Sequence, residues 1–398
     1  MLRRIALALV LTAAVTASTE EPFFTSELIF PLENWHNHGS CIVVCPNGDK
    51  LVCWFHGSGE RQSDDVLIRG ARLVKATGKW SEPFVMADQK EFPDTNCAMI
   101  IDPKERLWLL WPTILANTWE SALMHYRIST NYMQPEGSPV WDSSQLLLVK
   151  QREDFEQRSR EKTEEYVGPK PWPERTERWA ESNYAQAADK LTRRLGWFTR
   201  AHPKFLPDGR LLVGLYSDGF SVSLVGITDD LGENWHFSEP IVGGGNIQPS
   251  FAQRKDGTIV TYMRDNGPAP KMVHVSESTD RGETWSKVYD HPEFANPGAG
   301  LEIANLNDGD CVCIYNDLPA GRHPLAVALS DDEGRTWKWK RRLEQREPRE
   351  GAFHYPSITE DQDGIIHVTY SYFIDQPREG EIKGKSIKYA AFDKAWIK

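Results

Sequence analysis

The stretch STDRGETW at residues 278–285 decides the fold of this chain, because TDDLGENW at 228–235 and SDDEGRTW at 330–337 follow the same template. The three stretches recur about every 50 residues, a period typical of propellers and other repeat architectures. In each one, Asp and hydroxyl side chains are suited to bind turn amides, glycine permits a positive φ, and tryptophan can wedge between neighbouring sheets. The motif therefore predicts one structural turn in each of several repeated β units.

A second repeat, a glycine-type turn between an apolar run and an alternating strand, gives the number of units. One copy is FLPDGRLLVGLY at 205–216, which is typical of a β-hairpin. The six copies are centred on Asn47-Gly48, Lys104-Glu105, Asp208-Gly209, Asp256-Gly257, Asp308-Gly309 and Asp363-Gly364. Six copies predict an all-β protein, a six-bladed β-propeller that residues 19–398 form as one domain.

One interval between these hairpins is longer than the others, and residues 148–195 account for it. This segment is rich in Arg, Glu and Gln, and Pro171-Trp172-Pro173 separates two stretches of helical periodicity. We expect a helical insertion in blade three. It is interpreted as a solvated excursion on the side or rim of the propeller, with a lid over the mouth as the alternative.

Residues 1–18 show the three-part pattern of a secretory signal peptide: Arg3 and Arg4, an apolar run at 5–11, and small residues before position 19. The pattern predicts a secreted or periplasmic protein. The apolar run is too short to span a bilayer, and no other segment qualifies. A net charge of −11 disfavours nucleic acid as a partner. The oligomeric state is left open.

Neither a metal nor an organic cofactor is predicted. The six cysteines occupy apolar strand positions and lack a compact metal-ligand spacing, so buried thiols are expected. The glycine run at 243–245 precedes a predicted strand and not a helix, so it lacks the context of a phosphate-binding loop.

Polar residues at the ends of the inner strands are the candidate site residues, since the inner strands of a propeller converge on one central channel. Two arginines, Arg264 and Arg322, follow the second strands of blades four and five. The inner-strand candidates are His38, Asn96, Arg200, His202, Gln248, Glu302 and Tyr355.

The three octapeptides resemble the Asp-boxes of sialidases and other BNR-repeat proteins. Four further segments resemble this family in the same order, namely IQPS at 247–250, YMR at 262–264, GRHPLAVALS at 321–330 and HYPSI at 354–358. The resemblance covers about residues 36–393. It implies a sialidase-like glycoside hydrolase that acts on a glycan ending in an acidic sugar.

The resemblance also implies roles for single residues. Sialidases hold the substrate carboxylate with an arginine cluster and use a tyrosine nucleophile, an assisting glutamate and an aspartate acid/base; bidentate guanidinium binding and an activated phenol make this chemistry coherent. Arg264 and Arg322 match two of the three family arginines, and Tyr355 matches the nucleophile. Asp65 or its neighbour Asp64 matches the acid/base.

Two positions depart from the family pattern. The stretch NHGS at 37–40 lacks the first-blade arginine, and Gln248 stands where the family has glutamate. A neutral amide cannot take a proton as a carboxylate does, so either another acid such as Glu302 assists Tyr355 or the chemistry differs. Arg200, Arg69 or Arg72 could replace the missing cation.

The expected substrate-binding residues are Arg264, Arg322, Arg200, Gln248, His202 and His38, and the expected catalytic residues are Tyr355, Asp65 and Glu302. Two other functions remain open because of the departures. One is a glycosidase for another sugar, with a uronyl or rhamnosyl linkage. The other is a carbohydrate-binding propeller without catalysis, since the fold does not determine the function.

Overall fold

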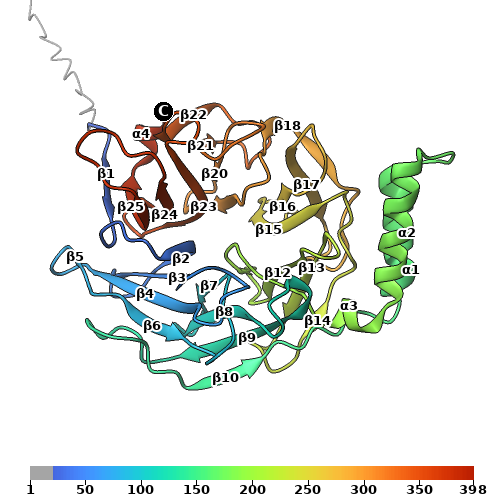
Figure 1. The fold of residues 1–398 in the computed structure, drawn as a ribbon, viewed down its shortest axis with the longest axis horizontal. Helices are drawn as coiled ribbons and strands as arrows, with labels where there is room; N and C mark the ends of the chain where they lie inside the picture. Colours follow the sequence, from blue (N-terminus) through green and yellow to red (C-terminus); the bar gives the residue numbers. More distant parts are fainter. Residues whose placement is uncertain (1–20) are drawn as a thin grey trace, which may run out of the picture.

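The computed structural model describes residues 21–398, which form six β-sheets arranged around a central axis (Figure 1). Five sheets have four strands and one has five. The predicted six-bladed β-propeller is therefore confirmed. The predicted signal peptide, residues 1–18, lies outside the described residues and stays a prediction.

In five blades the strands run outward from the axis in chain order, and in the sixth β1 is the outer strand. The inner strands are β2 (His36–Val44), β7 (Ala98–Ile101), β11 (Lys204–Phe205), β15 (Asn246–Gln253), β19 (Glu302–Asn305) and β23 (Gly351–Glu360). The second strands are β3 (Lys50–Gly57), β8 (Leu107–Ile114), β12 (Leu211–Ser217), β16 (Ile259–Asp265), β20 (Cys311–Tyr315) and β24 (Ile366–Ile374). The third strands are β4 (Leu67–Val74), β9 (Ala122–Ser129), β13 (Val222–Thr228), β17 (Met272–Ser278), β21 (Pro324–Ser330) and β25 (Gly384–Phe392). The outer strands are β5 (Lys79–Trp80) with β6 (Phe84–Ala87), β10 (Ser143–Leu146), β14 (His236–Phe237), β18 (Tyr289–Ala295), β22 (Trp339–Gln345) and β1 (Phe24–Leu28).

The ring closes through its first strand. β1 pairs antiparallel with β25, so the start of the described chain completes the sixth blade, whose other strands come from the end of the chain. Second strands such as β8 are buried along their whole length, whereas the outer strand β22 is largely exposed. Burial decreases from the inner to the outer strands because neighbouring blades cover both faces of the strands near the axis.

The six predicted hairpin turns join the inner and second strands of the six blades. In each turn, the second residue of the pair named above has a positive φ, and its backbone amide donates a hydrogen bond to the carbonyl oxygen three residues earlier. Five of these positions are glycine, and the sixth is Glu105 with a φ of 58°. The repeated turn is thus a shared backbone shape, for which glycine is favoured but not obligatory.

The three Asp-boxes form one turn, repeated at the ends of β13, β17 and β21. In the box of β17, the Ser278 hydroxyl accepts the Gly282 amide at 2.9 Å and Asp280 accepts the Thr284 amide at 2.9 Å. The box tryptophans join sheets: Trp235 packs on Tyr126 of blade two, and Trp337 donates to the Tyr262 hydroxyl of blade four. The boxes therefore support the ring.

The predicted helical segment is present as α1 (Phe155–Val167), α2 (Glu174–Ala188) and α3 (Lys190–Arg194), but its place differs from the prediction. β10 ends the second sheet and β11 begins the third, so the insertion lies between blades two and three, and not inside blade three. Residues 148–195 contribute no strand to either sheet, so the extra residues disturb neither one. α1 and α2 stand beside the ring and do not cover its axis (Figure 1).

Two further helical pieces are short, η1 (Trp119–Ser121) and α4 (Lys394–Ile397). Within residues 21–398, every helix falls short of the length and apolar character that crossing a bilayer requires.

Candidate active site at the mouth of the propeller

One face of the ring collects the polar residues that the sequence singled out. The second strands end at this face, and the loops at 58–66, 115–121, 218–221, 266–271, 316–323 and 375–383 lead from them to the third strands. The inner strands begin at the same face. We call it the mouth, because side chains from all six blades meet there around the axis.

Backbone bulges turn several inner-strand side chains toward the axis. The ladders of β2, β15 and β23 shift register between His38 and Cys41, Ile247 and Ser250, and His354 and Ser357. Within these bulges Gly39, Gln248 and Tyr355 have φ values of 64°, 60° and 55°. A left-handed conformation costs a non-glycine residue of order 1 kcal/mol or more, and such strain collects at functional sites.

Tyr355 is the centre of the mouth. Its hydroxyl oxygen accepts Nη1 of Arg264 at 2.8 Å and Nε2 of Gln248 at 3.2 Å. The guanidinium carbons of Arg200 and Arg322 lie 5.1 and 5.6 Å from the centre of its ring. The structure thus brings three predicted arginines, the predicted nucleophile and Gln248 together.

Arg200 is the third cation of this cluster. Of the other two candidates, Arg72 is fully buried and donates to the Tyr132 carbonyl, 3.7 Å from Asp49. Arg69 lies on β4, where burial and the Arg69 charge together lower the pKa of His56. Arg200 alone among the three stacks near the Tyr355 ring. Blade three therefore supplies the positive charge that the first blade lacks.

Two of the three mouth arginines keep unused buried donors. Arg200 is 3% exposed, yet its Nε and Nη1 bind nothing, and Nε of Arg264 is also free. The guanidinium nitrogens that do form hydrogen bonds donate only to neutral oxygens. Nη2 of Arg200 donates to the Pro356 carbonyl at 2.5 Å, and Nη2 of Arg322 donates to the Gly298 carbonyl at 2.6 Å. Buried cations without carboxylate partners are costly. Among the described residues, this cluster combines positive charge with free N–H donors, the two features that binding of an anion requires.

Histidines complete one wall of the mouth. The His38 ring lies 4.3 Å from the Tyr355 ring and 4.7 Å from that of His354, and Nδ1 of His38 is 2.8 Å from the Ser371 hydroxyl. Burial, together with the nearby positive charges, holds the pKa of His38 and of His354 well below the usual value. Both imidazoles are therefore neutral at pH 7 and add no charge to the arginine cluster.

Gln248 links two phenols. Its Nε2 lies 3.2 Å from the hydroxyls of both Tyr355 and Tyr216, and the Tyr216 hydroxyl accepts Nδ2 of Asn96 at 2.7 Å. Gln248 occupies the space beside the nucleophile candidate, as the sequence pattern predicts, but as a hydrogen-bond donor. Gly300 leaves room for it, since a Cβ there would lie 2.9 Å from Oε1 of Gln248.

Glu302 and His202 form a separate pair. Oε1 of Glu302 accepts the backbone amide and lies 2.7 Å from Nδ1 of His202, and Oε2 accepts the Ile358 amide at 3.0 Å. Burial alone would raise the pKa of Glu302, but the His202 charge and hydrogen bond lower it. Nε2 of His202 reaches the Ile42 carbonyl at 2.7 Å. The pair's hydrogen bonds therefore tie blades together, and none of them reaches the Tyr355 hydroxyl.

Residues 169–368, half of the chain, match the BNR repeat-like domain family. The chain belongs to this family. A curated relative, the anhydrosialidase of Macrobdella decora, is 28% identical over 182 residues, which cover 42% of this chain and 23% of that protein.

Solved structures with the same fold include several sialidase-like proteins. The intramolecular trans-sialidase from Ruminococcus gnavus superposes with a TM-score of 0.66 at 14% identity, over 91% of this chain and 95% of that one. The leech intramolecular trans-sialidase gives 0.67 at 14% identity, over 96% and 71%. A protein of unknown function from Dyadobacter fermentans gives 0.65 at 13% identity, over 92% and 97%. These similarities show that this BNR-repeat protein has the sialidase propeller fold.

The carboxylates at the mouth of this BNR-repeat protein are more numerous than the sequence indicated. Asp65 accepts the Ser58 hydroxyl at 2.8 Å, and Asp64 accepts Nδ2 of Asn117 at 2.8 Å, so both hold mouth loops. Neither bonds to Tyr355 or an arginine of the cluster. Two further acids, Glu60 and Asp218, lie in loops that follow second strands, and this position was the signal that could have revealed them.

Glu60 and Asp218 interact with the arginine cluster through their charges. Burial raises the pKa of Asp218, although Arg264 opposes the shift. Burial would also raise the pKa of Glu60, but a 3.1 Å contact with His36 and the charges of His36, Arg61 and Arg322 lower it overall. The mouth thus has one carboxyl group that is biased toward its protonated form and one that is biased toward its ionised form.

Proposed function

We propose that this protein is a secreted, sialidase-like glycoside hydrolase that releases a terminal acidic sugar from glycans. The convergence of Arg200, Arg264 and Arg322 on Tyr355 carries the proposal. Membership in the BNR repeat-like family and the similarity to an anhydrosialidase support it. Guanidinium groups with unused donors, those of Arg200 and Arg264, suit a sugar carboxylate, which accepts bidentate hydrogen bonds.

The proposed reaction uses the phenol of Tyr355 as the nucleophile. The phenol gives its proton to water, its oxygen forms a bond to the anomeric carbon as the glycosidic bond breaks, and a carboxylic acid protonates the departing oxygen. Water then releases the sugar with retained configuration, and the phenol regains its proton. Two N–H donors, from Arg264 and Gln248, point at the phenol oxygen and stabilise negative charge there. This arrangement supports a nucleophile whose neighbour cannot act as a base.

The proton donor is the open step of this proposal. The family resemblance assigns it to Asp65, whereas burial raises the pKa of Asp218, the direction that favours a proton donor. Asp65→Asn, Asp218→Asn and Glu60→Gln separate the candidates. Loss of the true donor lowers kcat strongly for natural leaving groups and little for an aryl glycoside that needs no protonation.

Hydrolysis of sialosides and of uronosides by the purified protein is the direct test. Turnover of one panel, with a loss of about 10³-fold or more in Tyr355→Phe, is expected for removal of a nucleophile. If no sugar is released from either panel, and Tyr355→Phe is indistinguishable from the parent, the proposed hydrolase function is rejected.

Gln248 favours a second candidate, a propeller that binds an acidic sugar without cleaving it. The amide stands beside Tyr355 where a base is expected, and the hydrogen bonds of Glu302 go to His202 and Ile358. Calorimetric titration with free sialic acid and glucuronic acid distinguishes the candidates. Binding that Arg264→Met abolishes, in the absence of any turnover, would establish the second candidate.

Export is part of the proposal and rests on residues 1–18 alone. Expression of the full chain with its N-terminus intact, followed by mass spectrometry of the exported protein, tests it. A mature N-terminus close to residue 19 is expected, and a full-length protein retained in the cytoplasm would contradict it.

A further inference from the structure

A pocket of about 250 Å³ lies where the helical insertion meets the mouth loops of blade four. Tyr166 of α1 and Trp179 of α2 form its aromatic wall, with ring centres 5.9 Å apart and planes at 62°. Arg175 and Thr176 add polar groups, and Gly244 and Pro268 form the propeller side. The lining contains no carboxylate.

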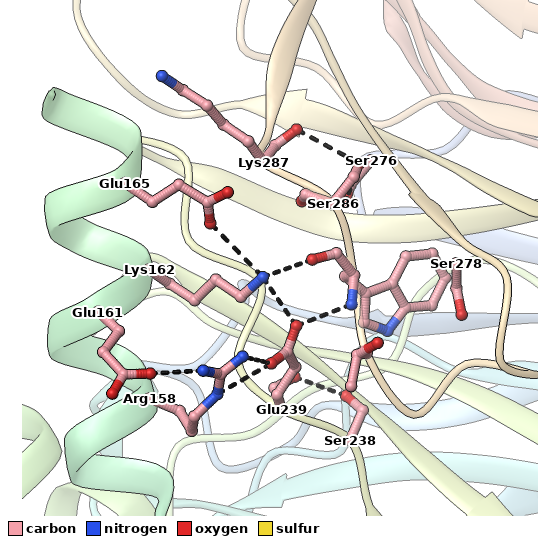
Figure 2. A network of polar contacts seen from close by, with 12 residues as sticks. Arg158, Glu161, Lys162, Glu165, Ser238, Glu239, Ser276, Ser278, Ser286 and Lys287 are labelled. Atoms are coloured by element: carbon pink, nitrogen blue, oxygen red, sulfur yellow. Dashed lines mark hydrogen bonds and ion pairs between the residues drawn. The ribbon is translucent and has the colours of Figure 1, made fainter.

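A buried ionic network fixes this wall on the ring. Glu239, which follows β14 and is 1% exposed, binds Arg158 and lies 2.8 Å from Nζ of Lys162 (Figure 2). The same carboxylate accepts the Trp285 amide at 2.8 Å. Two charged residues of α1 thus meet one buried acid of blade three, while Trp285 connects it to the Asp-box of blade four. The position of the aromatic wall is therefore set by the propeller.

The pocket is adjacent to the mouth. Pro268 lies two residues after Asn266, whose side chain accepts Nη2 of Arg264 at 3.1 Å. On the other side Tyr166 packs on Gly244, where a Cβ would lie 2.8 Å from the Tyr166 hydroxyl. The loop that begins with Asn266 beside Arg264 therefore also forms the propeller side of the pocket, at Pro268.

The chemistry of the pocket suits a sugar. Aromatic faces stack on the apolar C–H faces of pyranoses, and a few polar groups fix orientation in such pockets. Arg175 is exposed and has no hydrogen bond or ion pair among the described residues, whereas Arg178, one turn on, is paired with Glu174 at 2.8 Å. The volume is below the ~300 to 1,000 Å³ of pockets for larger ligands, so one sugar residue of a longer chain fits best.

We propose that this pocket binds a second sugar residue of the glycan, on the leaving-group side of the sugar held at Tyr355. The inference rests on the proposed function for the identity of the glycan. It assigns to the insertion a role in selecting long substrates, which a blade connection without helices would lack.

A substrate ladder with one terminal sugar tests the inference. The probes are 4-methylumbelliferyl sialoside, 3′-sialyllactose and sialyl-lacto-N-tetraose. For Trp179→Ala and Arg175→Ala we expect KM to rise about 5- to 10-fold on both oligosaccharide probes, with kcat unchanged and the aryl sialoside unaffected, because only uniform binding is lost. Arg178→Ala is the matched control and keeps the parent values. Equal KM values for the parent and both pocket variants across the ladder would overturn the inference.

A binding measurement separates this inference from the proposed function. Neutral lacto-N-tetraose, which has no acidic sugar, is titrated calorimetrically into the parent, Trp179→Ala and Arg175→Ala. Binding by the parent that both variants weaken would support the pocket, whether or not the parent hydrolyses any substrate. Absence of hydrolysis would count only against the proposed hydrolase function. No binding by the parent, or equal affinity in all three proteins, would overturn the pocket. Circular dichroism confirms that the variants are folded.

Discussion

The two faces of the ring differ in how their polar groups are satisfied. On the Asp-box face each turn completes its hydrogen bonds within eight residues, as Ser278 and Asp280 do for Gly282 and Thr284. At the mouth, Tyr355 of blade six meets side chains from blades three, four and five, and several arginine donors bind nothing. The repeated face thus supports the ring, and the unrepeated face is available to a ligand.

The charges show the same contrast. Arg281 on the Asp-box face lies 2.5 Å from Asp208 and 3.4 Å from Asp229. Arg264 at the mouth bonds only to the Tyr355 hydroxyl and the Asn266 amide oxygen. Paired surface arginines contribute little beyond local order, whereas a partly buried arginine without a carboxylate partner gains one when an anion binds.

The largest effect is expected when matched arginines are removed from the two faces. Arg264→Met should lower kcat/KM by about 10²- to 10⁴-fold, because each charge-assisted hydrogen bond contributes ~1.5 to 3 kcal/mol. Arg281→Met should stay within about two-fold of the parent. Steady-state kinetics on the substrate found by the panels measures both. Similar losses in the two variants would erase the distinction between the faces.

A smaller effect is expected from restoring a carboxylate at the mouth. Gln248→Glu places a base beside the Tyr355 hydroxyl and should raise kcat by about ten-fold or more, in line with general-base assistance. Gln248→Leu removes the donor without adding a base and should lower kcat. The two variants are compared at saturating substrate. A fall in kcat for a folded Gln248→Glu would show that Tyr355 needs a donor at this position.

The third prediction concerns the Asp-box face. Ser278→Ala leaves the buried Gly282 amide without its acceptor and should lower the free energy of unfolding by about 1 to 3 kcal/mol. Its kcat and KM should equal those of the parent. Ser182→Ala on exposed α2 is the control and should change stability by less than about 0.5 kcal/mol. Urea unfolding gives the numbers, and a kinetic defect in folded Ser278→Ala would contradict the assignment.

The smallest effect is a pH dependence at the Asp-box end of the channel. Burial lowers the pKa of Lys204 to about 8, and its Nζ donates to Asn305 at 2.9 Å. An unfolded lysine keeps its proton to about pH 10.4. Between these values the unfolded chain binds more protons, so stability should rise with pH.

Relative to Lys204→Met, the parent should gain about 1 kcal/mol between pH 7 and pH 10, since partial access of solvent reduces the full effect. Chemical unfolding at several pH values provides the comparison. If the free energy of unfolding changes with pH in the same way for the two proteins, the Lys204 amine stays solvated.

Much of the fold could be predicted because its signals are local. The three Asp-boxes and the six hairpin turns each close within a few residues, so their spacing predicted the number of blades. The insertion was harder to place. Its helical composition was visible, but whether it precedes or interrupts blade three depends on the pairing of β10 with β9, which is a contact between strands.

The candidate site could be predicted only in part. Arg264, Arg322 and Tyr355 were found from family segments, and the structure brings them together. Glu302 was expected beside Tyr355, but its hydrogen bonds go to His202 and Ile358. Asp218 and Glu60 were missed because their position after a second strand indicates the mouth but does not tell which charge each acid faces.

The sequence by itself determined the repeated unit, because turn geometry and tryptophan wedges depend on residues that are neighbours in the chain. Only the tertiary structure decided which arginine lies beside Tyr355 in place of the absent first-blade arginine. Arg200, Arg69 and Arg72 are the same residue type in the sequence and differ only in their surroundings. The reason is physical. Turns are satisfied within a segment, whereas the charge balance of a channel is the sum over six blades.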